Sequence, residues 1–303
     1  MSAHIGFMYL IIFAVFAESG SAQTPKGARS AGPFLVYDKS IPVDLKEIGV
    51  RENEGVRVRD VEYASLGAGH GRMNAFLVSP VARGRCAGVL FFHWLGKPNG
   101  DRTEFLEDAI ALAKNGTVSL LMQGSFPWLE EPTEATADAS RIVDQSIEVR
   151  RALDLLLSQP GVDPARIGFV GHDYGAMFGA VASGVETRIK AYVFMAGMGT
   201  FSDWSLKYWP RTASKGADVY RAAMKPLDPA HHLARAAPVP KLFQFSDSDI
   251  YISKSEAERF FGAATGPKEI RRYACGHELN MDAVRADRLM WLEKKLGLQA
   301  TKP

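Results

Sequence analysis

The chain has 303 residues, of which 47% are apolar and 23% are charged, and its formal net charge at pH 7 is +2. This composition is ordinary for a globular protein, and the length allows one large domain or two small ones. Because the charges nearly balance and no basic run stands out, neither nucleic acid nor an anionic membrane surface is an expected partner.

The first residues have the pattern of an export signal. Residues 5–17 form a nearly uninterrupted apolar run that is too short to cross a membrane comfortably. The small residues Gly20 and Ala22 follow and suit a signal peptidase, although His4 and no Lys or Arg precedes the run. We expect a signal peptide at residues 1–22, export to the periplasm or the medium, and no stable membrane association after cleavage. An uncleaved N-terminal anchor is the alternative.

Beyond about residue 55, short apolar runs alternate with longer segments of helical pattern. In chain order, we expect strands at 56–64, 72–79 and 87–92, a helix at 101–115, a strand at 117–122, a helix at 137–159, a strand at 167–170, a helix at 174–185, strands at 189–195 and 241–245, a helix at 254–264, a strand at 270–273 and a helix at 283–296. Such alternation across short connections predicts a mainly parallel sheet with helices on both faces, the α/β class. Since no repeat or low-complexity linker interrupts the series, residues 23–303 are expected to form a single domain.

The segment 199–238 does not follow this alternation, because it is rich in aromatic residues and irregular in pattern. An insertion of this kind is either a lid over a site or a packed surface excursion. Trp204, Tyr208 and Tyr220 lie in it and are our substrate-binding candidates, although aromatic residues in such segments are more often part of the core.

Neither a metal nor a cofactor is expected. No Cys/His cluster has zinc spacing, and no glycine loop matches a phosphate or dinucleotide site. The only cysteines are Cys86, at the start of an expected strand, and Cys275, beyond the end of another. In a parallel sheet these positions lie at opposite ends, so we do not expect a disulfide.

Three polar residues directly follow expected strands, and they are the candidate catalytic group. Asp173 follows the strand at 167–170, Asp249 the strand at 241–245, and His277 the strand at 270–273. In an open parallel sheet the ligand crevice lies beyond the carboxyl ends of the strands, so these side chains are expected to meet there. Aspartate is also a good helix cap, which is the alternative interpretation of Asp173.

The stretch at 171–175, "GHDYG", resembles the G-x-nucleophile-x-G elbow of the α/β-hydrolase fold, and the order of Asp173, Asp249 and His277 resembles its nucleophile, acid and histidine. The resemblance covers about residues 56–298. The layout of "VDPARIGFVGHDYG" is similar to dienelactone hydrolase-like esterases, whereas "GHDYG" is similar to the "GHDWG" elbow of epoxide hydrolases and haloalkane dehalogenases. Asp247 and Asp203 are rivals for the acid, but "FSDSDIYIS" resembles the family's acid loop with Asp249 in place.

The resemblance implies that Asp173 attacks a saturated carbon and forms an alkyl ester. His277 would then activate water against this ester, with Asp249 orienting the imidazole. Backbone N–H groups near Trp94 and of Tyr174 would hold the oxyanion. An ester substrate fits less well, because carboxylate attack on a carbonyl gives a high-energy anhydride.

The expected function is hydrolysis of an epoxide or a carbon–halogen bond in a small organic molecule. Epoxides are slightly favoured, since Tyr208 and Tyr220 are available to protonate an alkoxide. The alternatives are an ester or lactone hydrolase of the dienelactone hydrolase type and a non-catalytic ligand-binding relative. His93 and His172 are expected to support loop backbone through hydrogen bonds. The substrate and the oligomeric state stay open.

Overall fold

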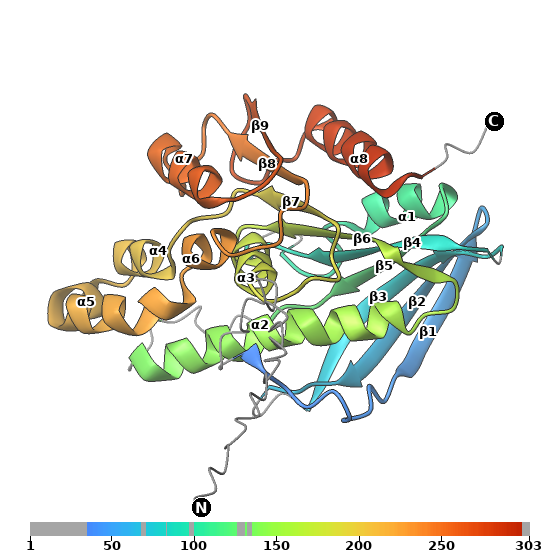
Figure 1. Ribbon diagram of the computed structural model, residues 1–303, viewed down its shortest axis with the longest axis horizontal. Helices are drawn as coiled ribbons and strands as arrows, with labels where there is room; N and C mark the ends of the chain where they lie inside the picture. The colour runs from blue at the N-terminus through green and yellow to red at the C-terminus, as the bar shows by residue number, and fades with distance from the viewer. Residues whose placement is uncertain are drawn as a thin grey trace, which may run out of the picture.

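A computed structural model describes residues 35–67, 71–82, 84–96, 100–125, 131 and 135–298. A twisted sheet crosses the molecule, with helices on both faces (Figure 1). Its strands are β1 (Lys46–Asn53), β2 (Val56–Ala64), β3 (Arg72–Pro80), β4 (Cys86–Phe92), β5 (Thr117–Met122), β6 (Val162–His172), β7 (Ala191–Met195), β8 (Lys241–Ser246) and β9 (Lys268–Tyr273). Across the described sheet the order is β1-β2-β3-β5-β4-β6-β7-β8-β9. The predicted α/β class is confirmed.

The helices cover the sheet in two layers. They are α1 (Leu106–Lys114), α2 (Ala135–Leu157), α3 (Tyr174–Ser183), α4 (Phe201–Tyr208), α5 (Pro210–Met224), η3 (Lys225–Leu227), α6 (Pro229–Leu233), α7 (Lys254–Ala263) and α8 (Asp282–Leu296). Helices α1 and α8 lie together on one face, while α2, α3 and α6 pack together on the other (Figure 1). Within the described residues, no helix is both long and apolar enough to cross a membrane. The expected signal peptide lies outside the described residues.

The burial pattern of the strands differs between the antiparallel and the parallel part of the sheet. Strands β1 to β3 and β5 pair antiparallel, and β2 alternates between buried and partly exposed residues as a half-covered strand does. The parallel strands β4, β5, β7 and β8 are buried at every residue, because helices cover both of their faces. The carboxyl ends of β4, β6, β7, β8 and β9 therefore meet at one edge of the sheet.

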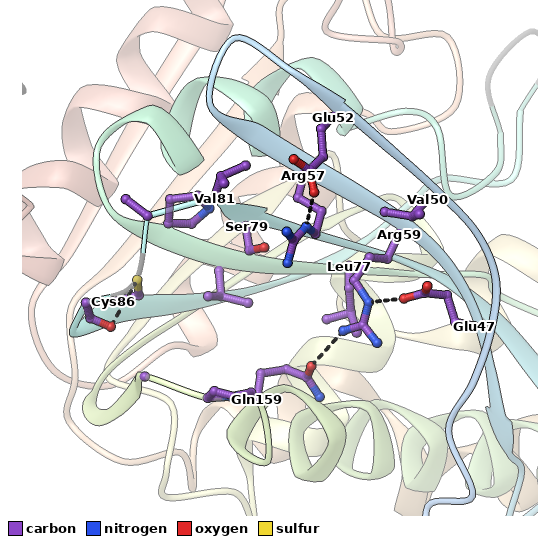
Figure 2. Close-up of a pocket in the computed structure, with 16 residues that line it drawn as sticks. Glu47, Val50, Glu52, Arg57, Arg59, Leu77, Ser79, Val81, Cys86 and Gln159 are labelled. Atoms are coloured by element: carbon purple, nitrogen blue, oxygen red, sulfur yellow. Dashed lines mark hydrogen bonds and ion pairs between the residues drawn. The ribbon is translucent and has the colours of Figure 1, made fainter.

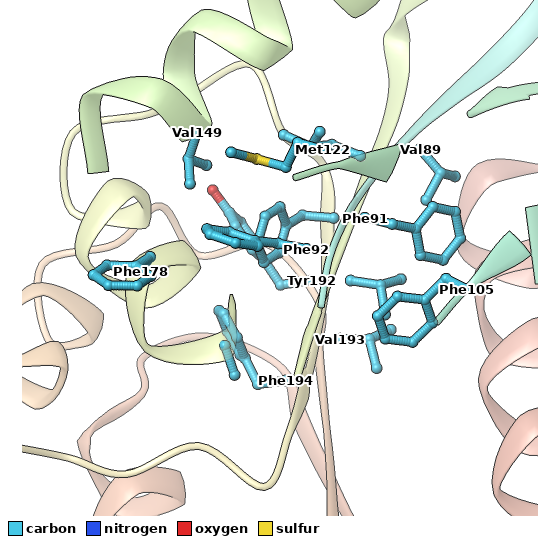
Figure 3. Packing of buried hydrophobic residues seen from close by; sticks show 14 of the residues in the cluster. Val89, Phe91, Phe92, Phe105, Met122, Val149, Phe178, Tyr192, Val193 and Phe194 are labelled. Carbon is cyan, nitrogen blue, oxygen red and sulfur yellow. The ribbon is translucent and has the colours of Figure 1, made fainter. Parts of the chain in front are cut away.

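Aromatic side chains fill the core on both sides of the sheet (Figure 3). Phe91 and Phe92 are neighbours on β4, so they point to opposite faces. Phe91 stacks on Phe105 with ring centroids 5.1 Å apart, and Phe92 stacks on Phe178 of α3 at 5.7 Å. Each buried ring of this kind stabilises the fold by roughly 1.5–3 kcal/mol through apolar burial. This packing fixes β4 and α3, which both border the candidate site.

The structure corrects three expectations about elements. Strand β1 was not predicted, because all eight of its residues are exposed and it lacks an apolar face. The helix expected at 101–115 begins only at Leu106, since the Asp101 side chain accepts the Thr103 N–H at 2.7 Å and forms a turn. The segment 199–238 is helical rather than irregular, as it contains α4, α5 and α6. Cys86 and Cys275 are both free, as expected.

Candidate active site

Asp173 occupies a strained turn between β6 and α3. Its φ of 51° and ψ of −116° lie outside the strand and helix regions, a conformation that costs a non-glycine residue about 1–3 kcal/mol. A Cβ atom at Gly171 would lie 2.5 Å from the Gly175 oxygen, and one at Gly175 would lie 2.2 Å from the Phe92 oxygen. Both glycines are therefore required, and the chain makes the sharp strand-to-helix corner that "GHDYG" predicts.

His277 and Asp249 form a buried pair at the same edge of the sheet. The His277 Nδ1 atom lies 2.8 Å from Asp249 Oδ2, and the side chains are 4% and 2% exposed. The other Asp249 oxygen accepts the backbone N–H groups of Tyr251 and Ile252 at 2.8 and 2.9 Å. Because the carboxylate is an acceptor, Nδ1 of His277 carries a proton, and in the neutral ring Nε2 presents a lone pair.

The structure separates Asp249 from its rivals. Asp247 is exposed, whereas the carboxylate that His277 contacts belongs to Asp249. Asp203 is also exposed, lies in the first turn of α4 and is 3.9 Å from Arg259. The choice of Asp249 as the partner of His277 therefore agrees with the geometry, and its catalytic role stays a prediction.

The free nitrogen of His277 faces Asp173. Nε2 lies 3.9 Å from Asp173 Oδ1, beyond hydrogen-bond distance. Burial raises the pKa of Asp173 above its usual value, although the charges of His277 and His172 oppose this. Burial alone would lower the pKa of His277, but the hydrogen bond to Asp249 and the charge of Asp173 outweigh it and raise the pKa overall. Burial acts against ionisation of Asp249 as well, yet the bond to His277 leaves its pKa lowered.

The backbone donors at the site differ in part from the prediction. The Trp94 N–H donates to Glu104 Oε2 at 2.8 Å, so it does not point at Asp173. Instead, the next residue, Leu95, directs its N–H towards Asp173 Oδ2 at 3.4 Å. The backbone N–H of Tyr174 also hydrogen-bonds the Asp173 carboxylate and lowers its pKa. The predicted donor Trp94 is thus replaced by Leu95, because Glu104 takes the Trp94 N–H.

His93 and His172 support the surrounding loops, as expected. The Nδ1 atom of His93 lies 2.6 Å from the Trp94 oxygen, and its Nε2 accepts the Gly124 N–H at 2.8 Å. His172 contacts Glu104 Oε1 at 2.7 Å and the His277 backbone oxygen at 3.0 Å. Trp94 adds a ring that stacks on His172 at 5.5 Å. These contacts fix the loops after β4 and β9 relative to the elbow.

An arc of aromatic side chains connects the two ends of the site. Tyr251 packs edge-on against His277 at 4.9 Å, and Tyr208 lies 6.1 Å from Tyr251. Trp204 contacts Tyr208 at 4.8 Å and Tyr174 at 5.2 Å. Trp204 and Tyr251 are half-buried, and Tyr208 is 36% exposed, so this arc presents apolar surface beside His277.

Tyr220 does not belong to this arc. It is 1% exposed, and its hydroxyl donates to Asp138 and accepts a hydrogen bond from the Ser205 hydroxyl. Burial and the Asp138 charge raise the pKa of Tyr220 well above its usual value. The structure therefore does not bring Tyr220 together with Trp204 and Tyr208, the other two substrate-binding candidates, because its hydroxyl is committed to holding α5 against α2.

A cavity of about 960 Å³ lies elsewhere, at the opposite end of β4 (Figure 2). Its walls come from β1, β2 and β3, with Cys86 and Gln159 at one side, and no predicted site residue lines it. Two ion pairs, Arg57 with Glu52 and Arg59 with Glu47, cross its rim. Among the described residues, no group of three or more His, Cys, Asp or Glu side chains is arranged to hold a metal ion.

No protein-family model matches this sequence, and no curated protein does. Solved structures do match. Acetyl xylan esterase 1 from Thermoanaerobacterium sp. JW/SL YS485 superposes with a TM-score of 0.69 at 17% identity, over 87% of this chain and 91% of that one. S-formylglutathione hydrolase from Agrobacterium tumefaciens gives 0.64 at 18% identity, over 83% and 100%. The α/β-hydrolase GrgF from Penicillium sp. sh18 gives 0.59 at 14%, over 80% and 99%. The chain has the α/β-hydrolase fold.

In this chain Asp173, Asp249 and His277 follow the parallel strands β6, β8 and β9. Three residues at the site were not predicted: Leu95, Glu104 and Tyr251. Leu95 and Tyr251 each lie within two residues of a predicted position, so the sequence already indicated the loops to which they belong. Glu104 reaches the site from the turn before α1, and nothing in its own sequence neighbourhood indicates that.

Proposed function

We propose that this chain is a hydrolase of a carboxylic ester or lactone, with Asp173, His277 and Asp249 as its reacting group. The observation that carries the proposal is the position of His277. Its Nδ1 is bound by Asp249 at 2.8 Å, and its Nε2 faces Asp173 at 3.9 Å in the elbow of an α/β-hydrolase fold. The similarity to an esterase and to an S-formylglutathione hydrolase supports the ester class.

The chemistry has to differ from that of a serine esterase, because Asp173 would form an anhydride by attacking an ester. We place a water molecule about 2.8 Å from both His277 Nε2 and Asp173 Oδ1. The angle at its oxygen between these two atoms is then roughly 90°, close to the angle between the O–H bonds of water. His277 then takes one proton as general base while Asp173 orients the other. The hydroxide formed attacks the ester carbonyl carbon directly.

The developing oxyanion needs donors, and the backbone N–H groups of Leu95 and Tyr174 supply them. The contact from Leu95 to Asp173 Oδ2 is long, at 3.4 Å, so a substrate carbonyl oxygen at about 2.9 Å replaces it at small cost. The proton on His277 finally passes to the leaving alcohol, which regenerates the neutral base.

A second candidate is attack by Asp173 itself on an epoxide or a carbon–halogen bond. One observation favours it: Oδ2 points to the Leu95 donor while Oδ1 faces His277. In that arrangement Oδ1 attacks, the donors hold Oδ2, and His277 delivers water to the resulting ester carbon. With Tyr220 committed to Asp138, Tyr251 and Tyr208 of the aromatic arc are our candidates to protonate an alkoxide.

The aromatic arc supports a substrate with an apolar, flat portion. Trp204, Tyr208 and Tyr251 offer partly exposed rings next to His277, and such rings bind apolar groups well. A small organic molecule is the proposed partner, and no cofactor is required by either reaction.

Hydrolysis in ¹⁸O water separates the two reactions. Turnover of 4-nitrophenyl acetate, dihydrocoumarin, styrene oxide and 1-bromobutane is measured over several cycles, and the peptide with Asp173 is weighed by mass spectrometry. Ester turnover with no label in Asp173 supports direct water attack, whereas label in Asp173 with an epoxide or haloalkane supports the covalent route. Asp173→Ala is the control. Equal activity of this variant and the native chain contradicts both routes, and no turnover of any probe favours the non-catalytic alternative.

We also propose that the chain is exported through residues 1–22. Expression of the full chain in a Gram-negative host, followed by N-terminal sequencing of the periplasmic and medium fractions, tests this. A mature protein beginning near Gln23 supports it, and an unprocessed chain in the membrane fraction supports the anchor instead.

A further inference from the structure

His172 lies between two groups that both accept hydrogen bonds. Its Nε2 is 3.0 Å from the backbone oxygen of His277, and its Nδ1 is 2.7 Å from Glu104 Oε1. A carbonyl oxygen only accepts, so Nε2 carries a proton. The second Glu104 oxygen accepts the Trp94 N–H at 2.8 Å. One proton lies between Nδ1 and Oε1, and we place it on Nδ1 because an imidazole is ordinarily more basic than a carboxylate.

We propose that His172 is a buried imidazolium, paired with Glu104, which keeps the adjacent Asp173 ionised and anchors the loop that carries His277. The His172 side chain is fully buried at 0% exposure, and that of Glu104 is 13% exposed. A charge at such a position requires a hydrogen-bonded partner of opposite sign, which Glu104 provides.

The other groups around His172 leave it as the cation of this cluster. His93 is buried, and burial lowers its pKa; its Nε2 accepts the Gly124 N–H, so its ring is neutral. The Trp94 ring stacks on His172 at 5.5 Å and carries no charge. The His277 ring lies 5.4 Å away, but it has to be neutral whenever it acts as a base.

The site needs His172 because His277 cannot be positively charged while it acts as a base. An aspartate at the elbow adds a third carboxylate to Asp249 and Glu104, and burial works against its ionisation. Both His277 and His172 offset that by their charge. When His277 gives up its proton to become a base, His172 is the positive charge that remains beside Asp173. The elbow of this chain tolerates a carboxylate because the preceding residue carries the compensating charge.

The charge of His172 is measured directly by NMR on the full chain. Long-range ¹H–¹⁵N spectra of histidine-labelled protein at pH 8 are expected to show both His172 nitrogens protonated, with His172→Gln giving the assignment. In Glu104→Gln, the amide donates to Nδ1 and His172 becomes neutral. A carboxyl ¹³C titration, assigned with Asp173→Asn, is then expected to show the Asp173 midpoint about one pH unit higher than in the native chain.

His232→Gln is the matched control, because it also replaces a buried histidine that contacts a backbone oxygen, that of Pro226 at 3.0 Å. This variant should change neither the protonation of the His172 nitrogens nor the titration midpoint of Asp173. One unprotonated His172 nitrogen in the native chain at pH 8 overturns the imidazolium, and an unchanged Asp173 midpoint in Glu104→Gln overturns the coupling. Should Glu104→Gln not fold, the midpoint in His172→Gln decides in the same way. The role given to Asp173 rests on the proposed function, but neither readout needs a substrate, so the two can fail separately.

Discussion

The backbone N–H of Leu95 points at Asp173 Oδ2 across 3.4 Å, so a donor that a substrate oxygen would use faces the chain's own carboxylate. The contact joins the loop after β4 to the elbow after β6, and it sits at the end of two neighbouring parallel strands. Three requirements of acyl transfer, namely a donor, a histidine and its acid, are therefore present around a residue that is unsuited to form an acyl-enzyme.

Asp173→Ser is expected to raise hydrolysis of 4-nitrophenyl acetate above the native level. A serine hydroxyl at the elbow meets the lone pair of His277, which Asp249 already orients at 2.8 Å. Steady-state rates and a burst of 4-nitrophenol, which reports an acyl-enzyme, check this. Asp173→Ala serves as the control, and a serine variant no faster than the alanine variant contradicts the idea that the remaining groups are set for ester chemistry.

Asp249→Asn is expected to move the acid limb of the pH profile of kcat/KM to lower pH. Asp249 and Asp173 raise the pKa of His277, so the native limb lies above the usual histidine value of about 6.5, and activity falls as His277 is protonated. Removing the Asp249 charge lowers that pKa. The plateau should also drop by about a thousandfold or more, because the imidazole loses its orienting partner. Asp247→Asn, in the same loop but exposed, should change neither the acid limb nor the plateau of the profile.

Tyr220→Phe is expected to destabilise the fold by about 2–3 kcal/mol. The change removes the hydroxyl that donates to the buried Asp138 and accepts from Ser205, and it leaves a buried carboxyl with one partner fewer. Urea unfolding followed by tryptophan fluorescence measures the loss. Tyr208→Phe, at a ring that is 36% exposed, should stay within about 0.5 kcal/mol of the native chain. Equal effects of the two changes contradict the structural role of Tyr220.

Asp228→Asn is expected to stabilise the chain at pH 8 and not at pH 4. Burial raises the pKa of Asp228 from 3.8 to about 7, and the charge of Asp203 adds to this. The stabilising protonated form is thus fully present below about pH 4 and is lost as the pH rises through 7. Asparagine keeps the acceptor for the Phe201 N–H but cannot ionise.

The gain at pH 8 should be about 1–2 kcal/mol, after discounting for partial exposure of the carboxyl. Thermal melts of the native chain and the variant at both pH values measure it. Asp218→Asn, whose side chain is 100% exposed, should give the same difference at both pH values. A gain for Asp228→Asn that does not grow with pH contradicts the raised pKa.

Gly175→Ala is expected to abolish folding or to cost more than about 3 kcal/mol. Its Cβ would lie 2.2 Å from the Phe92 oxygen and 2.7 Å from the His93 oxygen, and backbone atoms cannot move aside as a side-chain end can. Gly262→Ala, in α7 with nothing within 4 Å of the added atom, is the matched control and should be neutral or stabilising by up to about 1 kcal/mol. Thermal unfolding followed by circular dichroism measures the stability of both variants against the native chain.

The sequence predicts the parts of this site that depend on short stretches of chain. Gly171, Asp173 and Gly175 make one sharp turn, and the turn residues specify it locally. Asp249 and His277 each follow a buried strand, and the parallel sheet brings such positions together. Glu104 was missed because its role depends on tertiary packing of the loop before α1 against β6. Trp94 was misassigned for the same reason, since Glu104 takes its N–H.

The elements missed or mistaken have equally physical reasons. Strand β1 carries no buried residue, so its sequence lacks the alternation that reveals a strand. In 199–238 the helices are short or interrupted, for example by the non-helical backbone of Gly216 within α5, and a helical period is hard to detect over so few turns.

The hydrogen bond between His172 and the His277 backbone joins residues 105 positions apart, and it has a consequence for how the chain folds. Contacts of such long sequence separation form late, after the cost of closing the loop has been met by other packing. The elbow can form with the central strands, but the base arrives only when β9 and the segment after it dock. During refolding, fluorescence should therefore recover before activity does. A partly folded chain has the elbow in place while His277 has not yet reached it.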